Sequence, residues 1–169
     1  MKTDTRLSEL NNWLATVAPK WSIDPNSIKP ASSDASFRRY FRVLGDKNAQ
    51  NSSFIIMDAP PQSEDTRPFI AVAELLAETG VNVPLVLESD VTQGFLLLSD
   101  LGNQTYLSAL SPETAPKLYK EASAALIKMQ QASGANKLPH YDRALLTREL
   151  DLFPEWYLNK HLQIHLNES

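Results

Sequence analysis

The stretch FRRYFRVLGDKNAQNSSFIIMDAPP, residues 37–61, decides the fold. Aromatic and apolar residues interleave with arginines over residues 37–44, and a second apolar run over residues 53–59 ends at a pair of prolines. Short runs of strand-forming residues separated by turn residues are typical of a β-hairpin. Residues 45–52 supply the polar turn. The sequence therefore predicts two antiparallel strands joined by this turn.

Before the hairpin, the sequence predicts one helix and a connector. Apolar residues near the N-terminus recur at steps of three and four, which is the spacing of an amphipathic helix. These residues are Leu7, Leu10, Trp13, Leu14 and Val17. Pro19 is expected to close this helix. Residues 21–36 contain prolines and turn residues with little periodicity, and they predict a connector that becomes a strand near Ile28.

After the hairpin, the sequence predicts a helix and two more strands. Residues 69–80 have helical spacing after Pro68, which the first turn of a helix tolerates, and Gly80 is expected to end the helix. Residues 81–89 and 94–100 predict strands that a polar turn separates. The apolar run at the start of the second strand is unbroken, so this strand is expected to be covered on both faces.

From Thr105 onward the pattern is mostly helical, over residues 105–110, 112–132 and 144–166. A switch from a mixed region to helices alone predicts a boundary between two lobes near residues 99–105.

Length, composition and charge exclude several classes of protein. The chain has 169 residues, enough for a substantial core, with 16 Lys and Arg against 20 Asp and Glu, so its net charge is −4. This balance argues against a protein that binds mainly nucleic acid or an anionic membrane. The absence of cysteine excludes disulfides, thiolate metal sites and cysteine nucleophiles. No apolar run has the length of a membrane span, and the N-terminal pattern is not that of a signal peptide, so we expect a cytoplasmic protein.

Two segments are candidate ligand-binding loops. Residues 32–36, SSDAS, are all small, so their backbone N–H groups could approach a phosphate closely, although a tight hairpin with solvated serines and no glycine is the alternative. Residues 99–102, SDLG, stand where strands give way to helices, and their backbone groups could bind a flat heterocycle such as adenine. The alternative for this second segment is a simple turn.

Three further features carry weaker signals. Glu74 could orient a cation, or it could be a solvated glutamate on a helix surface. His161 and His165 have the spacing of one helix face, but a metal site needs three or four converging ligands and no third is evident, so no metal site is predicted. Carboxylates beside Trp156 and Tyr157 are suited to a polyhydroxylated ligand, or these aromatic side chains pack in the core.

Five blocks of sequence together resemble a known family. They are SSDASFRRYFR (32–42), MDAPP (57–61), GVNVP (80–84), GFLLLSDLGNQTYL (94–107) and YDRALLTRELDLFPEWY (141–157). In order and spacing they resemble the bacterial anomeric sugar kinases that phosphorylate N-acetylmuramate and N-acetylglucosamine. These kinases belong to the aminoglycoside phosphotransferase superfamily, whose fold is bilobal and similar to that of protein kinases.

The resemblance implies an α+β fold. Residues 1–98 would form the N-terminal nucleotide-binding lobe, an antiparallel sheet with a helix, preceded by the leading helix. Residues 99–104 would be the hinge, and residues 105–169 would begin an all-helical C-terminal lobe that is incomplete here.

The resemblance also implies the site residues. Those implied for nucleotide binding are Ser32, Ser33, Asp34, Ala35, Ser36, Phe37, Arg38, Arg42, Met57, Glu74, Ser99, Asp100, Leu101 and Gly102. Those implied for sugar binding are Glu149, Trp156 and Tyr157. The cofactors implied are ATP and Mg²⁺, and neither nucleic acid nor a membrane is an expected partner.

The sequence departs from the kinase pattern in two ways. Met57 stands where such kinases carry a lysine on the third strand, so the usual pair with Glu74 cannot form. Arg38, Arg39 or Arg42 could supply the missing charge, with Arg39 on the opposite strand face from the other two. The His-x-Asp…Asn catalytic loop is also missing after residue 157, and with it the expected metal ligands.

We therefore expect the nucleotide-binding half of a kinase for the anomeric hydroxyl of an N-acetylated amino sugar, acting in cell-wall recycling and inactive by itself. One alternative is a non-catalytic module that binds a nucleotide or a partner protein. Another is a kinase for a different small hydroxylated substrate, such as an aminoglycoside.

Overall fold

The computed structural model describes residues 4–33, 37–46, 51–132 and 138–164. The chain divides into two compact units, residues 1–132 and 133–169. The first unit contains a five-stranded antiparallel sheet whose strands lie in the order β1-β2-β3-β5-β4. The strands are β1 (Ile23–Ser33), β2 (Arg39–Gly45), β3 (Ser53–Asp58), β4 (Val86–Asp90) and β5 (Phe95–Ser99). The helices of this unit are α1 (Thr5–Trp21), α2 (Arg67–Glu78), α3 (Tyr106–Ala109) and α4 (Ala115–Ala132).

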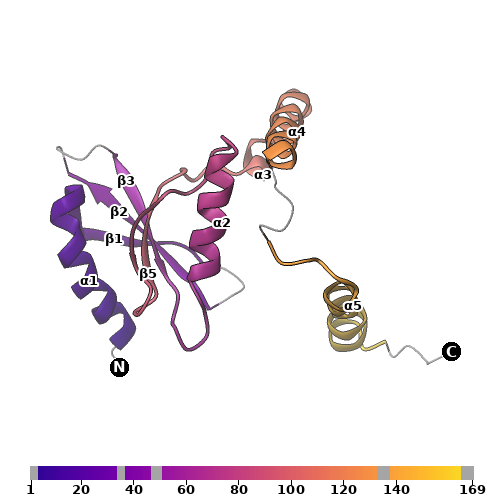
Figure 1. The fold of residues 1–169 in the computed structure, drawn as a ribbon, viewed down its shortest axis with the longest axis horizontal. Helices are drawn as coiled ribbons and strands as arrows, with labels where there is room; N and C mark the ends of the chain where they lie inside the picture. Colours follow the sequence, from indigo (N-terminus) through magenta and orange to yellow (C-terminus); the bar gives the residue numbers. More distant parts are fainter. Residues whose placement is uncertain (1–3, 34–36, 47–50, 133–137, 165–169) are drawn as a thin grey trace. The chain divides into compact units, whose positions relative to one another are not determined.

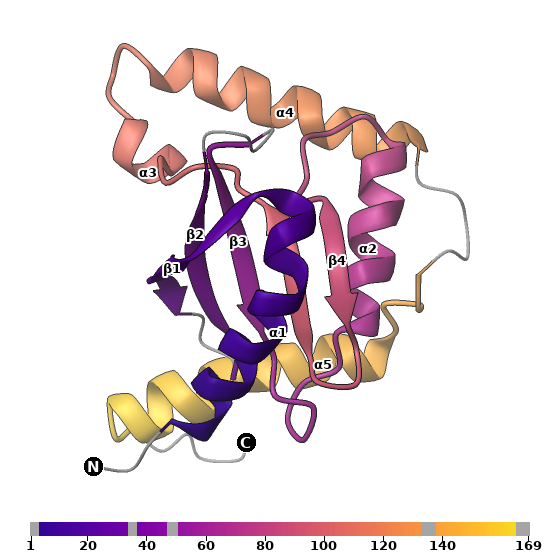
Figure 2. The same ribbon diagram turned by 90° about the vertical axis from the view of Figure 1, so that its left-hand side faces the viewer.

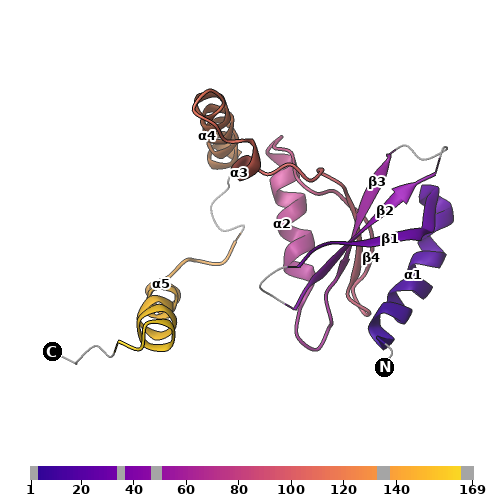
Figure 3. The same ribbon diagram turned by 180° about the vertical axis from the view of Figure 1, so that it is seen from behind.

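Helices α1 and α2 cover opposite faces of the sheet (Figures 1 and 3). On one face, Leu10 and Leu14 of α1 pack in a core with Val43, Phe54 and Leu97. On the other face, the buried side chains of Met57, Leu96 and Leu98 pack with Phe69 and Ile70 of α2. The sheet is thus the middle of three layers, an α+β arrangement.

The predicted hairpin and the buried strand are both confirmed. β2 pairs with β3 in a register that sets Tyr40 opposite Met57 and Arg42 opposite Ile55. β5 lies between β3 and β4 (Figure 2 shows β4 beside α2), and its residues 95–98 are almost completely buried. Coverage on both faces explains why the apolar run is continuous.

The prediction that Pro19 ends the first helix is wrong. The helix continues to Trp21 and is capped by Ser22, whose N–H donates to the carbonyl of Ala18. A proline in the last turn removes only one helical hydrogen bond. The side chain of Trp21 compensates, because it packs on the core and its Nε1 donates to Glu88 at 2.8 Å.

The predicted connector over residues 21–36 is largely strand. β1 begins at Ile23, five residues before the expected position, and its pairing with β2 shifts register between Asp24 and Lys29 and again between Pro30 and Ser32. An edge strand tolerates prolines because one side of its backbone has no strand to pair with. The position at the edge of the sheet, which only the tertiary structure reveals, allows this proline-rich segment to be a strand.

The second unit contains α5 (Arg143–Leu152) and the π-helix η1 (Phe153–His161). The helical prediction for this region is confirmed, but the winding changes at Pro154, which has no N–H to donate to a preceding carbonyl. Beyond it the bonds span five residues, as from Leu162 N to Tyr157 O at 2.9 Å. No described helix has both the length and the apolar character needed to cross a membrane.

A buried ionic network joins α1 to the sheet. The fully buried carboxylate of Asp58 accepts from Arg6 Nε at 2.7 Å and from Arg39 Nε and Nη2 at 2.9 and 2.6 Å. Arg39 also donates to Asp4, the N-cap residue of α1, at 2.6 Å. The Arg6 guanidinium lies 4.0 Å from the centroid of the Phe95 ring.

Replacement of Asp58 is expected to destabilise the fold severely. Asp58→Ala leaves two arginines without their buried partner, and we expect a loss of about 3–5 kcal/mol in the free energy of unfolding. Urea denaturation measures this loss. Asp65→Asn, which breaks an exposed pair with Arg67, is the control and should cost less than about 1 kcal/mol. Equal losses for the two variants would contradict a stabilising role for the network.

Gly94 in the β4–β5 turn is expected to be irreplaceable. Its φ is +73°, and an added Cβ would lie 1.9 Å from the carbonyl oxygen of Ala59. Gly80 has the same φ but open space around it, so Gly80→Ala isolates the backbone cost of about 1–2 kcal/mol. We expect Gly94→Ala to lower the melting temperature well beyond Gly80→Ala, and similar shifts would exclude the steric explanation.

Candidate functional site

A cavity of about 560 Å³ lies on the α2-facing side of the sheet, beside the end of β5. This volume is within the range of about 300–1,000 Å³ that is usual for small-molecule sites. Its walls are the side chains of Tyr40, Arg42, Ile55, Phe69, Pro84 and Leu98, with Ala31 of β1 and residues 99–105. Apolar walls with one polar segment along the side are suited to a flat heterocycle.

The alternation of strand residues builds the apolar walls. Tyr40 and Ile55 come from the α2-facing side of β2 and β3, and both pack with the α2-side core. Leu98 is the corresponding residue of β5, opposite Ile55 in the register. Three neighbouring strands therefore each contribute one side chain to the same wall.

Three residues bind the carboxylate of Asp100 and form a cluster with it. Arg42 Nε donates to Oδ2 at 2.6 Å and Arg42 Nη2 to Oδ1 at 3.1 Å. Ser53 Oγ donates to Oδ2 at 2.7 Å, and the N–H of Gly102 donates to Oδ1 at 2.8 Å. Arg42 Nη2 also donates to the carbonyl of Gly102 at 3.2 Å. We call these residues, Arg42, Ser53, Asp100 and Gly102, the Asp100 cluster.

The Asp100 cluster holds its carboxylate ionised. The hydrogen bonds from Arg42, and then those from Ser53 and the Gly102 N–H, lower the pKa of Asp100 to about 2. The Asp100 side chain is only 5% exposed, so solvent screens these interactions little. The cluster therefore persists across the whole physiological pH range.

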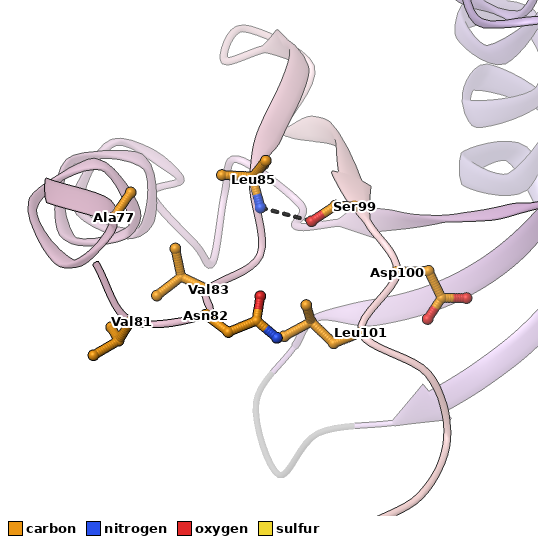
Figure 4. Close-up of a pocket in the computed structure, with 8 residues that line it drawn as sticks. All are labelled: Ala77, Val81, Asn82, Val83, Leu85, Ser99, Asp100 and Leu101. Carbon is orange, nitrogen blue, oxygen red and sulfur yellow. Dashed lines mark hydrogen bonds between the residues drawn. The ribbon is translucent and has the colours of Figure 1, made fainter. Parts of the chain in front are cut away.

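Some backbone N–H and C=O groups of residues 99–102 already make hydrogen bonds within the protein, and others do not. The Ser99 N–H donates to the carbonyl of Leu85 at 2.9 Å, and Ser99 Oγ accepts from the Leu85 N–H at 2.8 Å (Figure 4). Both backbone groups of Gly102 belong to the Asp100 cluster. Within the described part of the chain, no hydrogen bond reaches the N–H or the C=O of Leu101. The backbone N–H and C=O of Asp100 make no hydrogen bond to a described residue either, so Asp100 and Leu101 both have backbone groups that can bind a ligand.

A second hollow, of about 470 Å³, also borders residues 99–101 (Figure 4). Its other walls come from the C-terminal part of α2 and the segment that leads into β4: Ala77, Val81, Asn82, Val83 and Leu85. In Figure 4 the side chains of Asn82 and Leu101 lie beside each other, while the carboxylate of Asp100 points away from this hollow.

Each of the three arginines considered for phosphate binding is paired with a carboxylate. Arg38 Nε lies 3.2 Å from Glu64 Oε2, Arg39 binds Asp58, and Arg42 binds Asp100. Arg39 and Arg42 lie on opposite faces of β2, as the alternation predicts. The charge of each of these side chains is therefore already balanced by a carboxylate.

The residues implied for the third strand and its helix do not form a polar pair. Met57 is buried in the α2-side core, opposite Tyr40. Glu74 is exposed on α2, and its carboxylate makes no ion pair with a described residue. The missing lysine is therefore replaced by an apolar contact at this position.

The small-residue loop is described only at its ends. Ser32 and Ser33 are the last residues of β1, and Asp34, Ala35 and Ser36 lie outside the described residues. The Phe37 N–H donates to Glu64 Oε1 at 3.3 Å, and its side chain is exposed. The predicted phosphate-binding role of this loop stays a prediction.

The residues implied for sugar binding are exposed in the second unit. Trp156 and Tyr157 lie on η1 and Glu149 on α5. Lys160 Nζ lies 3.6 Å from the Trp156 ring centroid, and the Tyr157 ring stacks with Phe153 and His161 at 5.4 and 5.6 Å. The predicted sugar contact is not tested by this arrangement.

Among the described residues, no three histidine or acidic side chains gather into a possible metal site. His165 of the histidine pair lies outside these residues. Sequence reasoning missed Ser53 and Glu64, because only the strand register and the folded loop bring them to their partners. It also missed the cavity walls: strand alternation was the available signal for Tyr40, Ile55 and Leu98, and helical spacing for Phe69.

Comparison with known proteins identifies the family. The model of the phosphotransferase enzyme family matches residues 27–168. Three curated relatives are each named N-acetylmuramate/N-acetylglucosamine kinase. The protein of Pseudomonas aeruginosa is 50% identical and that of Pseudomonas putida 45% identical, both over 98% of this chain. The protein of Neisseria meningitidis serogroup B is 42% identical over 93% of this chain.

The matches cover 50%, 50% and 46% of the three relatives, so the chain spans about half the length of the curated relatives it matches. The resemblance seen in the sequence is confirmed, and the five-stranded antiparallel sheet with its helices agrees with the α+β fold that the resemblance implied. On the extent of the family match, this chain belongs to the phosphotransferase enzyme family.

Proposed function

We propose that this chain is the nucleotide-binding half of a kinase that transfers phosphate from ATP to the anomeric hydroxyl of N-acetylmuramate or N-acetylglucosamine. The observation that carries the proposal is the cavity beside residues 99–102, in a chain 50% identical to a relative that is named as such a kinase. Cell-wall recycling in the cytoplasm, where ATP is available, is the corresponding setting.

The adenine base would occupy the slot between Ile55, Phe69 and Leu98. These side chains offer apolar contact to both sides of a planar ring, and the neighbouring segment provides the free backbone groups of Leu101. Residues 99–104 would then be the hinge that joins a nucleotide lobe, residues 1–98, to the helices that follow.

The phosphates would extend toward the small-residue loop after β1. Ala31 lines the cavity immediately before Ser32, which supports this direction. Backbone N–H groups of Ser32 to Ser36 are the proposed phosphate ligands. The Phe37 N–H and the Arg38 side chain would join them if they exchange Glu64 for phosphate. Met57 and Glu74 would support the cavity and the helix without forming a charged pair.

The chemistry of phosphoryl transfer consists mostly of positioning and charge stabilisation. Mg²⁺ would neutralise charge on the phosphates when bound, and we assign neither the Mg²⁺ ligands nor the base to a residue of this chain. Glu149, Trp156 and Tyr157 are the proposed contacts for the sugar, through hydrogen bonds to hydroxyl groups and packing on the sugar ring.

A direct assay tests the reaction. The complete gene product is incubated with Mg-ATP and N-acetylmuramate, N-acetylglucosamine or kanamycin, and ADP release and ³¹P NMR of the product are recorded. We expect a sugar 1-phosphate from each amino sugar and no ADP with kanamycin. Transfer to kanamycin alone would support a kinase for another substrate, and ATP binding without any transfer would support a non-catalytic module.

Filling the cavity should affect nucleotide binding selectively. Ile55→Trp places a large ring in the slot, and we expect the KM for ATP to rise about tenfold, the equivalent of about 1.4 kcal/mol of lost binding. The KM for the sugar should stay unchanged. Leu44→Trp, at an exposed position of β2, is the control and should leave both constants as in the wild type. An unchanged KM for ATP in Ile55→Trp would place the base elsewhere.

The stability that the ionised Asp100 side chain contributes at the proposed hinge should depend on pH. The pKa of Asp100 in the folded state, about 2, lies below the value of 3.8 that is usual for an aspartate side chain. The resulting stabilisation is therefore present above about pH 4 and is lost as the pH falls toward 2. We expect Asp100→Asn to cost about 2 kcal/mol at pH 7 and little near pH 2, as urea denaturation measures. The exposed Asp151→Asn is the control, and a pH-independent difference for Asp100→Asn would contradict the ionic role.

A further inference from the structure

We propose that Arg42 is the positioning residue of the nucleotide site: from strand β2 it binds the Asp100 carboxylate and the Gly102 carbonyl. It thereby engages Gly102 and leaves the backbone groups of Asp100 and Leu101 to bind the base. This inference rests on the proposed function, because it assumes that the cavity beside residues 99–102 takes a purine nucleotide.

The first observation is the geometry of the guanidinium. Arg42 reaches from β2 past β3 to the end of β5, and it has carboxylate and carbonyl partners at 2.6, 3.1 and 3.2 Å. A planar guanidinium can donate hydrogen bonds to these partners at the same time, because its N–H groups point in fixed directions. A lysine ammonium is a compact point charge and cannot reproduce this arrangement. Ser53 at the start of β3 fixes the same carboxylate from the neighbouring strand. The segment after β5 is thus attached to three adjacent strands.

The second observation is the distribution of backbone hydrogen bonds. The Gly102 N–H and C=O are both taken by the Asp100 cluster, and the Ser99 N–H is taken by Leu85. The backbone N–H and C=O groups of Asp100 and Leu101 make no hydrogen bond to any residue that the structure describes. Leu101 also lines both hollows beside this segment, so its backbone borders open space.

The third observation concerns the sequence expectation that Arg42 and Gly102 each contact the nucleotide directly. In the cluster, Arg42 instead binds a carboxylate that stays ionised at physiological pH, and the N–H and C=O of Gly102 each already have a hydrogen-bond partner. A site with one donor and one acceptor at fixed positions is selective, because a ligand with the reversed pattern leaves both groups unpaired.

Base selectivity tests this positioning role. Adenine carries an acceptor at N1 beside the N6 donor, whereas hypoxanthine carries a donor at N1 beside the O6 acceptor. Binding of Mg-ATP and Mg-ITP to the complete gene product is measured by calorimetry for the wild type and for Arg42→Lys. We expect Arg42→Lys to lose about tenfold in ATP affinity, the effect of about one hydrogen bond, with a much smaller loss for ITP.

The matched control is Arg39→Lys, at the neighbouring position of β2 but on the opposite face. Arg39 also binds a carboxylate with its fork, through Asp58, so the substitution lowers stability without touching the cavity. We expect Arg39→Lys to lower the melting temperature and keep the ratio of ATP to ITP affinity. If Arg42→Lys fails to fold, Ser53→Ala removes one support of Asp100 and should lower the same ratio to a smaller degree.

The outcomes separate the two proposals. If the wild type binds ATP and Arg42→Lys keeps the wild-type selectivity, the positioning role is wrong and the proposed function stands. Parallel losses in Arg39→Lys and Arg42→Lys would also overturn the positioning role, since stability alone would explain them. If the wild type binds neither nucleotide, the proposed function is wrong and this inference fails with it.

Discussion

The ion pair between Arg42 and Asp100 is the interaction on which the candidate site depends. β2 and β5 are not neighbours in the sheet, because β3 lies between them. Arg42 nevertheless joins them, and Ser53 of the intervening strand binds the same carboxylate. The chain that leaves the sheet after β5 is therefore held in one place, and one wall of the cavity with it.

A second ionic network lies on the other face of the sheet, and there too an arginine of β2 binds a carboxylate of another element. Arg39 binds the buried Asp58 and the N-cap residue Asp4, so that face is joined to α1. Residues 39 and 42 lie an odd number of positions apart and point to opposite faces of β2. One face thus anchors the leading helix and the other face shapes the cavity.

These pairings have a consequence for phosphate binding. A kinase site needs positive charge near the phosphates, and Met57 supplies none at the third-strand position. The neighbouring arginines already neutralise Asp58, Glu64 and Asp100. Breaking a largely buried pair to bind phosphate costs more than it returns unless the new contact is equally well formed. Under the proposed function, backbone N–H groups would therefore be the less costly source of phosphate contacts.

The local sequence pattern was sufficient to predict secondary structure wherever the structure of a segment depends on its own residues. The hairpin over residues 39–58, the helix after Pro68 and the buried strand at 95–98 were all predicted correctly. The errors occurred where distant contacts override local preference. Trp21 extends α1 past Pro19 by packing on the core, and the position of β1 at the edge of the sheet makes a proline-rich segment a strand.

The sequence by itself determined the α+β class, the existence of strands β2 to β5 and the segment, residues 99–102, where we expect a ligand. Only the tertiary structure decided which side chains pair, Arg42 with Asp100 and Arg39 with Asp58. It also decided that the backbone groups of Leu101 make no hydrogen bond to a described residue. The reason is that strand propensity and alternation act over a few residues, whereas these partners are 58 and 19 residues apart. The strand order and register bring them together, and both follow from packing of the whole sheet between α1 and α2.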